Sequence, residues 1–207
     1  MARQKSFLKF TGRIGDVSFY RSPDGYMARE KGGVDGDRIA TDPVFQRTRE
    51  NGAEFGTAGK GAKLIRTSMS NLVRSAADRL ATGRFTKQMV KVVKADGTSA
   101  RGSRNVLDGN LLLVEGFDFN IDAPLKSVFL APYETDVDRV TGKVDISIAP
   151  FVPTHAVIAP YGTTHFKIVS ASSEIDFVMV VWLQAGRILR CCHWKKHLQL
   201  LSPYRMH

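Results

Sequence analysis

The sequence has little of what builds a disulfide framework or a membrane span. Its 207 residues include two cysteines, Cys191 and Cys192, and because these are adjacent they provide neither a disulfide framework nor the spacing of metal ligands. No long uncharged apolar run is present, and Lys9 lies where a signal peptide would need its apolar segment. We therefore expect a cytoplasmic protein without a membrane partner.

The signatures of common enzymes are also missing. There is no Gly-x-Ser-x-Gly motif, and the glycine-rich residues 31–37 lack the Gly-Lys-Ser/Thr ending of a phosphate loop. No cysteine or third histidine lies near His155 and His165 to complete a metal site. Asp136-Val-Asp138 lacks the third alternate ligand, the glycine and the glutamate of a calcium loop, which favours a hairpin turn. We expect no catalysis, metal or cofactor.

Charge is unevenly distributed along the chain. The 30 basic and 20 acidic residues give a net charge of +10. This total comprises +11 over residues 1–104, −6 over 105–177 and +5 over 178–207. Asymmetry of this kind indicates segments with different surroundings. We divide the chain into an N-terminal β-hairpin with a glycine-rich loop (1–40), a basic helical region with a linker (41–104), an acidic antiparallel β region (105–177) and an atypical basic tail (178–207).

The first 40 residues predict a β-hairpin. Residues 16–20 and 26–29 have extended patterns, and the segment between them holds Pro23 and Gly25. Proline fixes φ for a turn and glycine tolerates positive φ, so the two segments are expected to pair.

The next region predicts helices. Asp42 is a suitable N-cap and Pro43 a suitable first helical residue. One helix face alternates aromatic rings with glycines and predicts close packing there; it comprises Phe45, Thr48, Gly52, Phe55 and Gly59. An apolar stripe then runs from Ile65 to Leu80, and a break is expected near Thr82-Gly83.

A third helix is expected over roughly residues 84–95, with a row of cations on one side. The row comprises Arg84, Lys87, Lys91 and Lys94, and the polar stretch after it adds Arg101 and Arg104. Such a row could bind the phosphates of a nucleic acid. The alternative is the solvated polar face of an ordinary amphipathic helix.

The acidic region changes to a β pattern. Short β-branched or aromatic segments at 125–130, 144–148, 156–159 and 165–169 are separated by Pro, Gly, Asp and Thr. The predicted class is α+β, in which an N-terminal β-hairpin and helices precede an antiparallel sheet or sandwich-like half.

The last 30 residues differ from the rest. Residues 178–207 hold both tryptophans, both cysteines and three of the five histidines, with no acidic residue. Back-translation in a shifted frame yields a Val-, Thr- and Pro-rich acidic string similar to residues 105–177. We expect a frameshifted tail and a truncated β half; the alternatives are a functional basic tail, binding metal or a membrane surface, and an ordinary terminal helix.

Several motifs carry a family resemblance. Gly12-Arg-Ile-Gly15, Tyr26-Met-Ala-Arg29 and Asp42-Pro-Val-Phe-Gln-Arg resemble an uncharacterised protein family of Bacteroidota, and the likeness extends to about residue 177. The family implies no activity, cofactor or catalytic residue. A looser likeness associates the hairpin and its helix with mobile or phage-derived genes.

The function expected from the sequence is therefore non-enzymatic. The leading hypothesis is a structural or interaction protein that binds a protein partner or itself. The alternative is a nucleic-acid-associated protein that uses Arg84, Lys87, Lys91, Lys94, Arg101 and Arg104 as phosphate contacts.

Overall fold

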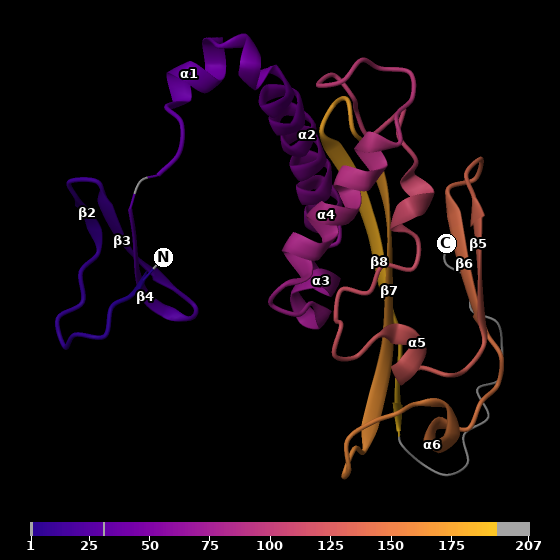
Figure 1. Ribbon diagram of the computed structural model, residues 1–207. Helices are drawn as coiled ribbons and strands as arrows, with labels where there is room; N and C mark the ends of the chain where they lie inside the picture. The colour runs from indigo at the N-terminus through magenta and orange to yellow at the C-terminus, as the bar shows by residue number, and fades with distance from the viewer. Residues whose placement is uncertain (1, 31, 194–207) are drawn as a thin grey trace. The chain divides into compact units, whose positions relative to one another are not determined.

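The computed structural model describes residues 2–30 and 32–193 (Figure 1). Helices and antiparallel strands both occur, so the predicted α+β class is confirmed. The chain divides into two compact units, with the boundary between Arg49 and Glu50, inside the first turns of helix α2 (Gln46–Ser68). Each unit is described by itself.

The N-terminal unit is built on a four-stranded antiparallel sheet. Its strands are β1 (Ala2–Arg3), β2 (Gly12–Ile14), β3 (Val17–Ser22) and β4 (Gly25–Glu30), in the order β1-β4-β3-β2. The predicted hairpin is confirmed as β3–β4, with Gly25 at φ +114° where a side chain would be strained.

Two short helices follow the sheet. Helix α1 (Gly36–Thr41) is capped by Asp35, and the 3₁₀ helix η1 (Pro43–Phe45) is capped by Asp42, whose side chain accepts a hydrogen bond from the Val44 N–H. The predicted Asp42 cap with Pro43 after it is therefore confirmed. Arg49 ties the two turns together by donating to the carbonyls of Ile39 and Asp42, at 2.7 and 2.9 Å.

The second unit holds the hydrophobic core. Its residues come from α2, from α4 (Ala81–Lys94) and from the loop that follows α4. The core residues are Ala58, Ala62, Phe85, Met89, Val92, Val93 and Val106. The face of α2 that packs is not the predicted one: Phe55 is exposed, whereas Gly61 is buried and a Cβ there would lie 3.0 Å from Val106 Cγ2. Bare backbone is thus needed at Gly61, two residues past the last glycine of the predicted face and on a different side of the helix.

The helical region also breaks at a different place. Helix α2 ends at Ser68, α3 covers Ser70–Ala76, and residues 77–80 separate α3 from α4. The expected break at Thr82-Gly83 is wrong, because both residues lie in the first turn of α4. Asp78 accounts for the actual break, since its side chain accepts from the Leu80 N–H and holds a non-helical turn.

Aromatic rings close one end of this core. Phe117 and Phe119 pack against Phe85, with ring centroids 5.0 and 5.2 Å from it. They follow the 3₁₀ helix η2 (Leu111–Val114), which contacts α4. Residues 105–119 are therefore anchored to the helices.

The rest of the unit consists of hairpins and single helical turns. The elements are α5 (Leu125–Val128), β5 (Tyr133–Asp138), β6 (Lys143–Ile148), α6 (Pro153–Ala156), β7 (His165–Asp176) and β8 (Val181–His193). Strands β5 and β6 pair with each other, as do β7 and β8. The predicted strands at 144–148 and 165–169 are confirmed, and so is the hairpin turn after Asp138.

Two predicted strands are wrong. Residues 125–128 form the turn α5, and Ala156 ends the turn α6. Pro153 is the first residue of α6, where a proline favours a helical start, and Pro124 is the N-cap of α5. Of the residues predicted as strands there, Phe129 and Val157 form an isolated antiparallel bridge.

Part of the atypical tail is a strand, which follows a turn at residues 178–180. Residues 181–193 form β8, which pairs with β7 along its length (Figure 1), so the terminal-helix alternative is wrong for these residues. Residues 194–207, which include Trp194 and His197, lie outside the described residues. The frameshift stays a prediction.

Candidate functional site

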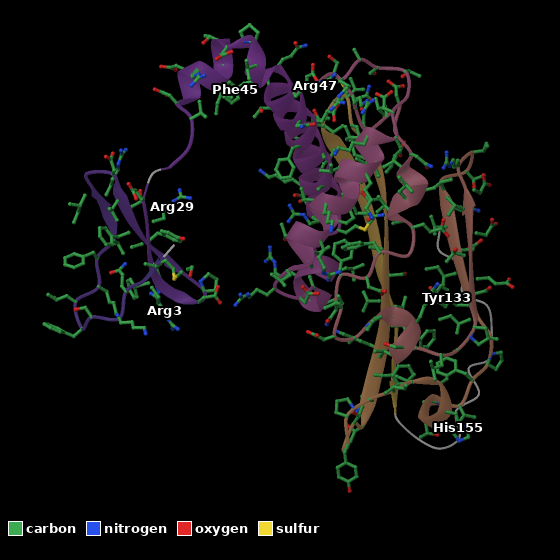
Figure 2. The ribbon with its side chains drawn as sticks, in the orientation of Figure 1. Arg3, Arg29, Phe45, Arg47, Tyr133 and His155 are labelled. Carbon is green, nitrogen blue, oxygen red and sulfur yellow. The ribbon has the colours of Figure 1, made fainter. Side chains whose placement is uncertain are left out.

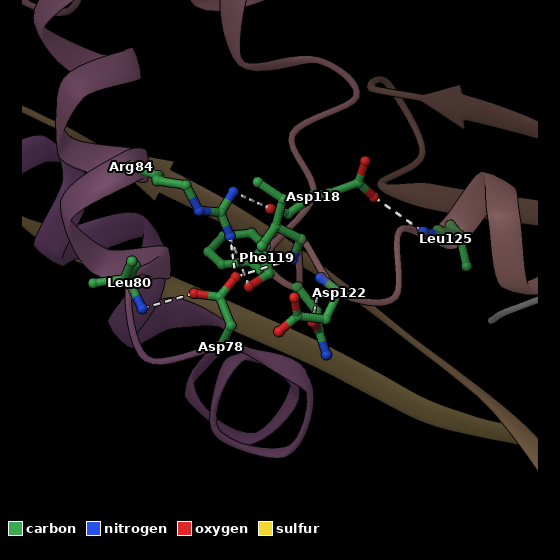
Figure 3. A network of polar contacts seen from close by, with 9 residues as sticks. Asp78, Leu80, Arg84, Asp118, Phe119, Asp122 and Leu125 are labelled. Atoms are coloured by element: carbon green, nitrogen blue, oxygen red, sulfur yellow. Dashed lines mark hydrogen bonds and ion pairs between the residues drawn. The ribbon is translucent and has the colours of Figure 1, made fainter.

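Arg84 is held by contacts within the second unit. Its guanidinium pairs with the Asp78 carboxylate and donates to the carbonyls of Asp118 and Phe119 (Figure 3). The same group lies 5.3 Å from the Phe117 ring centroid. Four contacts thus hold Arg84 against the chain, where it joins α4 to the loop at 118–119.

Asp78 is the centre of this network. Its Oδ2 also accepts from the Ile121 N–H at 3.0 Å, and Asp118 accepts from the Leu125 N–H at 3.0 Å (Figure 3). The hydrogen bond from Ile121, followed by those from Leu80 and Arg84, lowers the pKa of Asp78 below its usual range. The carboxylate therefore stays ionised and keeps the ion pair at neutral pH.

Arg101 and Arg104 face two glutamates of α2. Arg101 lies 3.6 Å from Glu50, and Arg104 lies 3.9 Å from Glu54. Glu54 is 2% exposed, and its Oε1 also accepts from the Gly102 N–H at 3.0 Å. These arginines fasten the loop at 101–104 onto α2.

The three lysines of the predicted row are arranged differently. Lys87, Lys91 and Lys94 are all exposed on the side of α4 opposite Phe85, Met89 and Val92. The described part of the chain provides no ion pair for any of them. Of the six predicted cations, these three are available to a ligand.

Asp96 orders the loop that begins where α4 ends. Its Oδ1 accepts from the backbone N–H groups of Thr98 and Ser99, and its Oδ2 from that of Asn105. Together these bonds hold the pKa of Asp96 far below its usual range, and the bond from Ser99 contributes most. The carboxylate is 1% exposed, so its role is to fold the loop.

The remaining candidates for chemistry lie apart. His155 is in α6, and the Nδ1 of His165 lies 3.0 Å from the Thr164 hydroxyl. Asp138 accepts from the hydroxyl and N–H of Thr141, which lowers its pKa and closes the β5–β6 turn. Within residues 2–30 and 32–193 no group of three His, Cys, Asp or Glu side chains could hold a metal ion.

The N-terminal sheet has two contrasting faces. Residues directly opposite each other in antiparallel strands share a face, and β4 lies opposite both β1 and β3. One face carries Arg3, Arg13, Ser18, Tyr20, Ser22, Met27 and Arg29. We call it the arginine face, since three of its residues are arginines and none is acidic.

Two of these arginines are supported by the sheet itself. The Arg29 guanidinium lies 5.7 Å from the Tyr20 ring centroid, a cation–π contact. Arg3, which is labelled with Arg29 in Figure 2, lies close to Gly25, where an added Cβ would be 3.4 Å from the Arg3 Nε. Both arginines remain exposed, whereas Arg13 leans toward the β2–β3 turn and pairs with Asp16 at 3.7 Å.

The opposite face of the sheet is largely apolar. It carries Ala2, Ile14, Val17, Phe19 and Ala28, with Arg21 over the Tyr26 ring and Glu30 at one end. Phe10, from the loop before β2, packs on Phe19 with centroids 5.7 Å apart. None of the described residues of this unit is buried, so the unit by itself encloses no hydrophobic core.

The hairpin β5–β6 is also two-faced. Tyr133, Val137, Val144, Ile146 and Ile148 share one face with Thr135. The other carries Glu134, Asp136, Asp138 and Asp145, which we call the acidic face, together with Lys143 and Ser147. Asp136 lies directly opposite Asp145, and two carboxylates in that position repel each other.

Comparison of the chain with protein-family models, with curated proteins and with solved structures finds no match. In the described part of the chain, no helix is long and apolar enough to cross a membrane. The site is therefore judged on its own geometry.

The sequence interpretation missed the arginine face. It considered the cations that follow each other on one helix, whereas Arg3, Arg13 and Arg29 are brought together by strand pairing. The alternation within residues 17–22 and 25–30 was an available signal, because it separates Tyr20 and Arg29 from Phe19 and Ala28.

Proposed function

We propose that the protein is a non-enzymatic assembly protein that acts by binding protein, first of all further copies of itself. The observation that carries the proposal is the N-terminal sheet, which displays an apolar face and a cationic face and buries none of its described residues. A sheet unit that encloses no buried side chain has little hydrophobic stabilisation of its own, and contact with a partner would add to it. We also propose that the protein is cytoplasmic and that it belongs to the uncharacterised family of Bacteroidota that its motifs resemble.

Light scattering after size-exclusion chromatography tests this proposal. The average mass of the full chain should rise with protein concentration, because each copy brings the same open sheet. A second readout is amide exchange in β3 and β4, which should slow as the mass rises. A monomer at every concentration, with unchanged exchange, would overturn the proposal.

The second candidate is nucleic-acid binding. The exposed Lys87, Lys91 and Lys94 favour it, because they lie along one side of α4 without partners in the described chain. Arg84, Arg101 and Arg104 add less, since each already contacts a carboxylate. A contact through three lysines alone would be weak and strongly salt-dependent.

Fluorescence anisotropy with duplex DNA across a salt series tests the second candidate. Three phosphate contacts give a slope of about −2.7 in log K against log salt. The triple variant K87Q/K91Q/K94Q should lose most of the binding, whereas the matched variant K126Q/K143Q/K167Q, which removes as many exposed lysines elsewhere, should keep it. Equal loss in both would show general charge attraction only.

A further inference from the structure

The arginine face needs an anionic partner. Arg3 and Arg29 are both exposed, and no acidic residue shares their face of the sheet. The Arg29 guanidinium lies over the Tyr20 ring and the Arg3 guanidinium lies close to Gly25, and neither contact neutralises the charge. A ligand for this face should therefore supply at least two negative charges on a surface of matching spacing.

The acidic face of the β5–β6 hairpin carries the opposite charge and therefore favours a cationic partner. On the acidic face of β5–β6, Asp136 and Asp145 lie opposite each other. Asp145 is half-buried and its Oδ1 is enclosed without a hydrogen-bond partner in the described chain, so Glu134, Asp136 and Asp138 of β5 are the carboxylates that a partner can reach. Asp138 is satisfied by Thr141, but all residues of β5 are exposed. A cationic partner would relieve the repulsion between the two carboxylates.

The two faces also match in spacing. Both are antiparallel pleated surfaces, so side chains on one face repeat every two residues along a strand and once per strand across it. That grid is roughly 7 Å by 5 Å on both surfaces. Arg3 lies opposite Met27, two residues before Arg29, so the two arginines are diagonal neighbours on β1 and β4. Glu134 and Asp145 are diagonal neighbours on β5 and β6 in the same way, and Asp136 lies directly opposite Asp145.

We infer that the arginine face of one copy docks on the acidic face of the β5–β6 hairpin of a second copy. This inference rests on the proposed assembly function and names its contact. The contact is heterologous, because the two surfaces differ, so each added copy leaves one face of each kind free. The protein then grows into rings or open chains instead of stopping at a dimer.

A single-stranded nucleic acid is a poorer occupant. A stacking platform needs open aromatic rings, whereas the one tyrosine of this face lies under the Arg29 guanidinium. A nucleic acid would also leave the opposed pair Asp136 and Asp145 without a cation. The charge pattern within the chain therefore favours a second copy.

Two neutral double variants test the contact. R3Q/R29Q removes the cations of one surface, and D136N/D145N removes the repelling carboxylates of the other without a change of shape. Each variant should remain monomeric at concentrations where the wild type associates, with at least a tenfold weaker association. The matched variant K126Q/K167Q loses two exposed charges elsewhere and should associate as the wild type does.

Mixing the two variants gives the decisive result. R3Q/R29Q keeps its acidic face and D136N/D145N keeps its arginine face, so an equal mixture should form a 1:1 dimer that does not grow. Circular dichroism of each variant checks that it is folded. The hairpin of D136N/D145N should be no less stable than the wild type, because a repulsion has been removed.

Three results would overturn the inference. If R3Q/R29Q or D136N/D145N associates as strongly as the wild type, these faces are not the contact, although assembly itself stands. If both are monomeric and their mixture stays monomeric, the two faces do not meet. If the wild type is monomeric and binds single-stranded DNA in a way that R3Q/R29Q abolishes, the arginine face is a nucleic-acid site.

Discussion

Two sets of arginines, one in each unit of the chain, are used in opposite ways. In the second unit Arg84, Arg101 and Arg104 contact Asp78, Glu50 and Glu54, and they connect loops to helices. In the N-terminal sheet the Arg29 guanidinium lies over the Tyr20 ring and Arg3 lies close to Gly25, and both arginines remain exposed. Charge that is neutralised inside one unit stabilises a fold, whereas charge left open in the other is available for binding.

The second unit also buries side chains that the N-terminal unit does not. The second unit encloses Phe85, Met89, Val92 and Val93 almost completely, while the N-terminal unit buries none of its described residues. We therefore expect the second unit to be stable by itself and the N-terminal unit to depend on a partner for its stability.

The largest effect is expected from opening the core. Phe85→Ala should reduce the free energy of unfolding by about 3–5 kcal/mol, because the ring is 1% exposed and packs against two other phenylalanines. Phe19→Ala in the open sheet should cost about 1 kcal/mol or less. Urea unfolding measures both; equal losses would remove the contrast between the units.

The arginine network should come next. Arg84→Ala should cost about 2 kcal/mol, because it removes charge-assisted bonds to Asp78 and to two carbonyls. Lys87→Ala is the control on the same helix and should change stability by less than about 0.5 kcal/mol. A similar loss for both residues in thermal unfolding would contradict the structural role of Arg84.

These outcomes bear on what the sequence could predict. It predicted the α4 amphipathic helix and the row on it, since spacing along a helix is a local property. It could not show that Arg84 meets Asp118 and Phe119, because that contact joins residues 34 and 35 positions apart. Local spacing places a charge on a face; only tertiary contacts decide whether the charge is neutralised.

The same limit explains the strand predictions. Residues 144–148 alternate strictly and have a hairpin turn beside them, so they pair as expected. Residues 125–130 are as apolar as residues 144–148, but residues 125–128, which follow Pro124, form a helical turn. The arginine face was missed because cross-strand neighbours such as Arg3 and Met27 are distant in sequence.

A pair of glycines sharpens the comparison between packed and open positions within α2. Gly61→Ala should destabilise by about 1 kcal/mol or more, since its Cβ would lie 3.0 Å from Val106 and 3.2 Å from Met89. Gly56→Ala, where nothing lies within 4 Å, should stabilise by about 0.5–1 kcal/mol. Effects of the same sign in urea unfolding would contradict the packing described.

One further expected effect depends on pH. The pKa of Asp96 is depressed in the fold, so its contribution to stability is present above the ordinary Asp pKa of about 3.9 and is lost as pH falls below it. Asp96→Asn should lower the thermal midpoint at pH 7, and the difference from the wild type should narrow toward pH 3. A difference that is constant with pH would contradict this role.

The central claim is that the N-terminal sheet is completed by a second copy while the helical core is complete by itself. Hydrogen exchange of the full chain at low and high protein concentration tests it most directly. The account predicts that protection rises with concentration in residues 2–30 and 133–148 and stays unchanged in α4. Exchange that is independent of concentration in all three segments would contradict it.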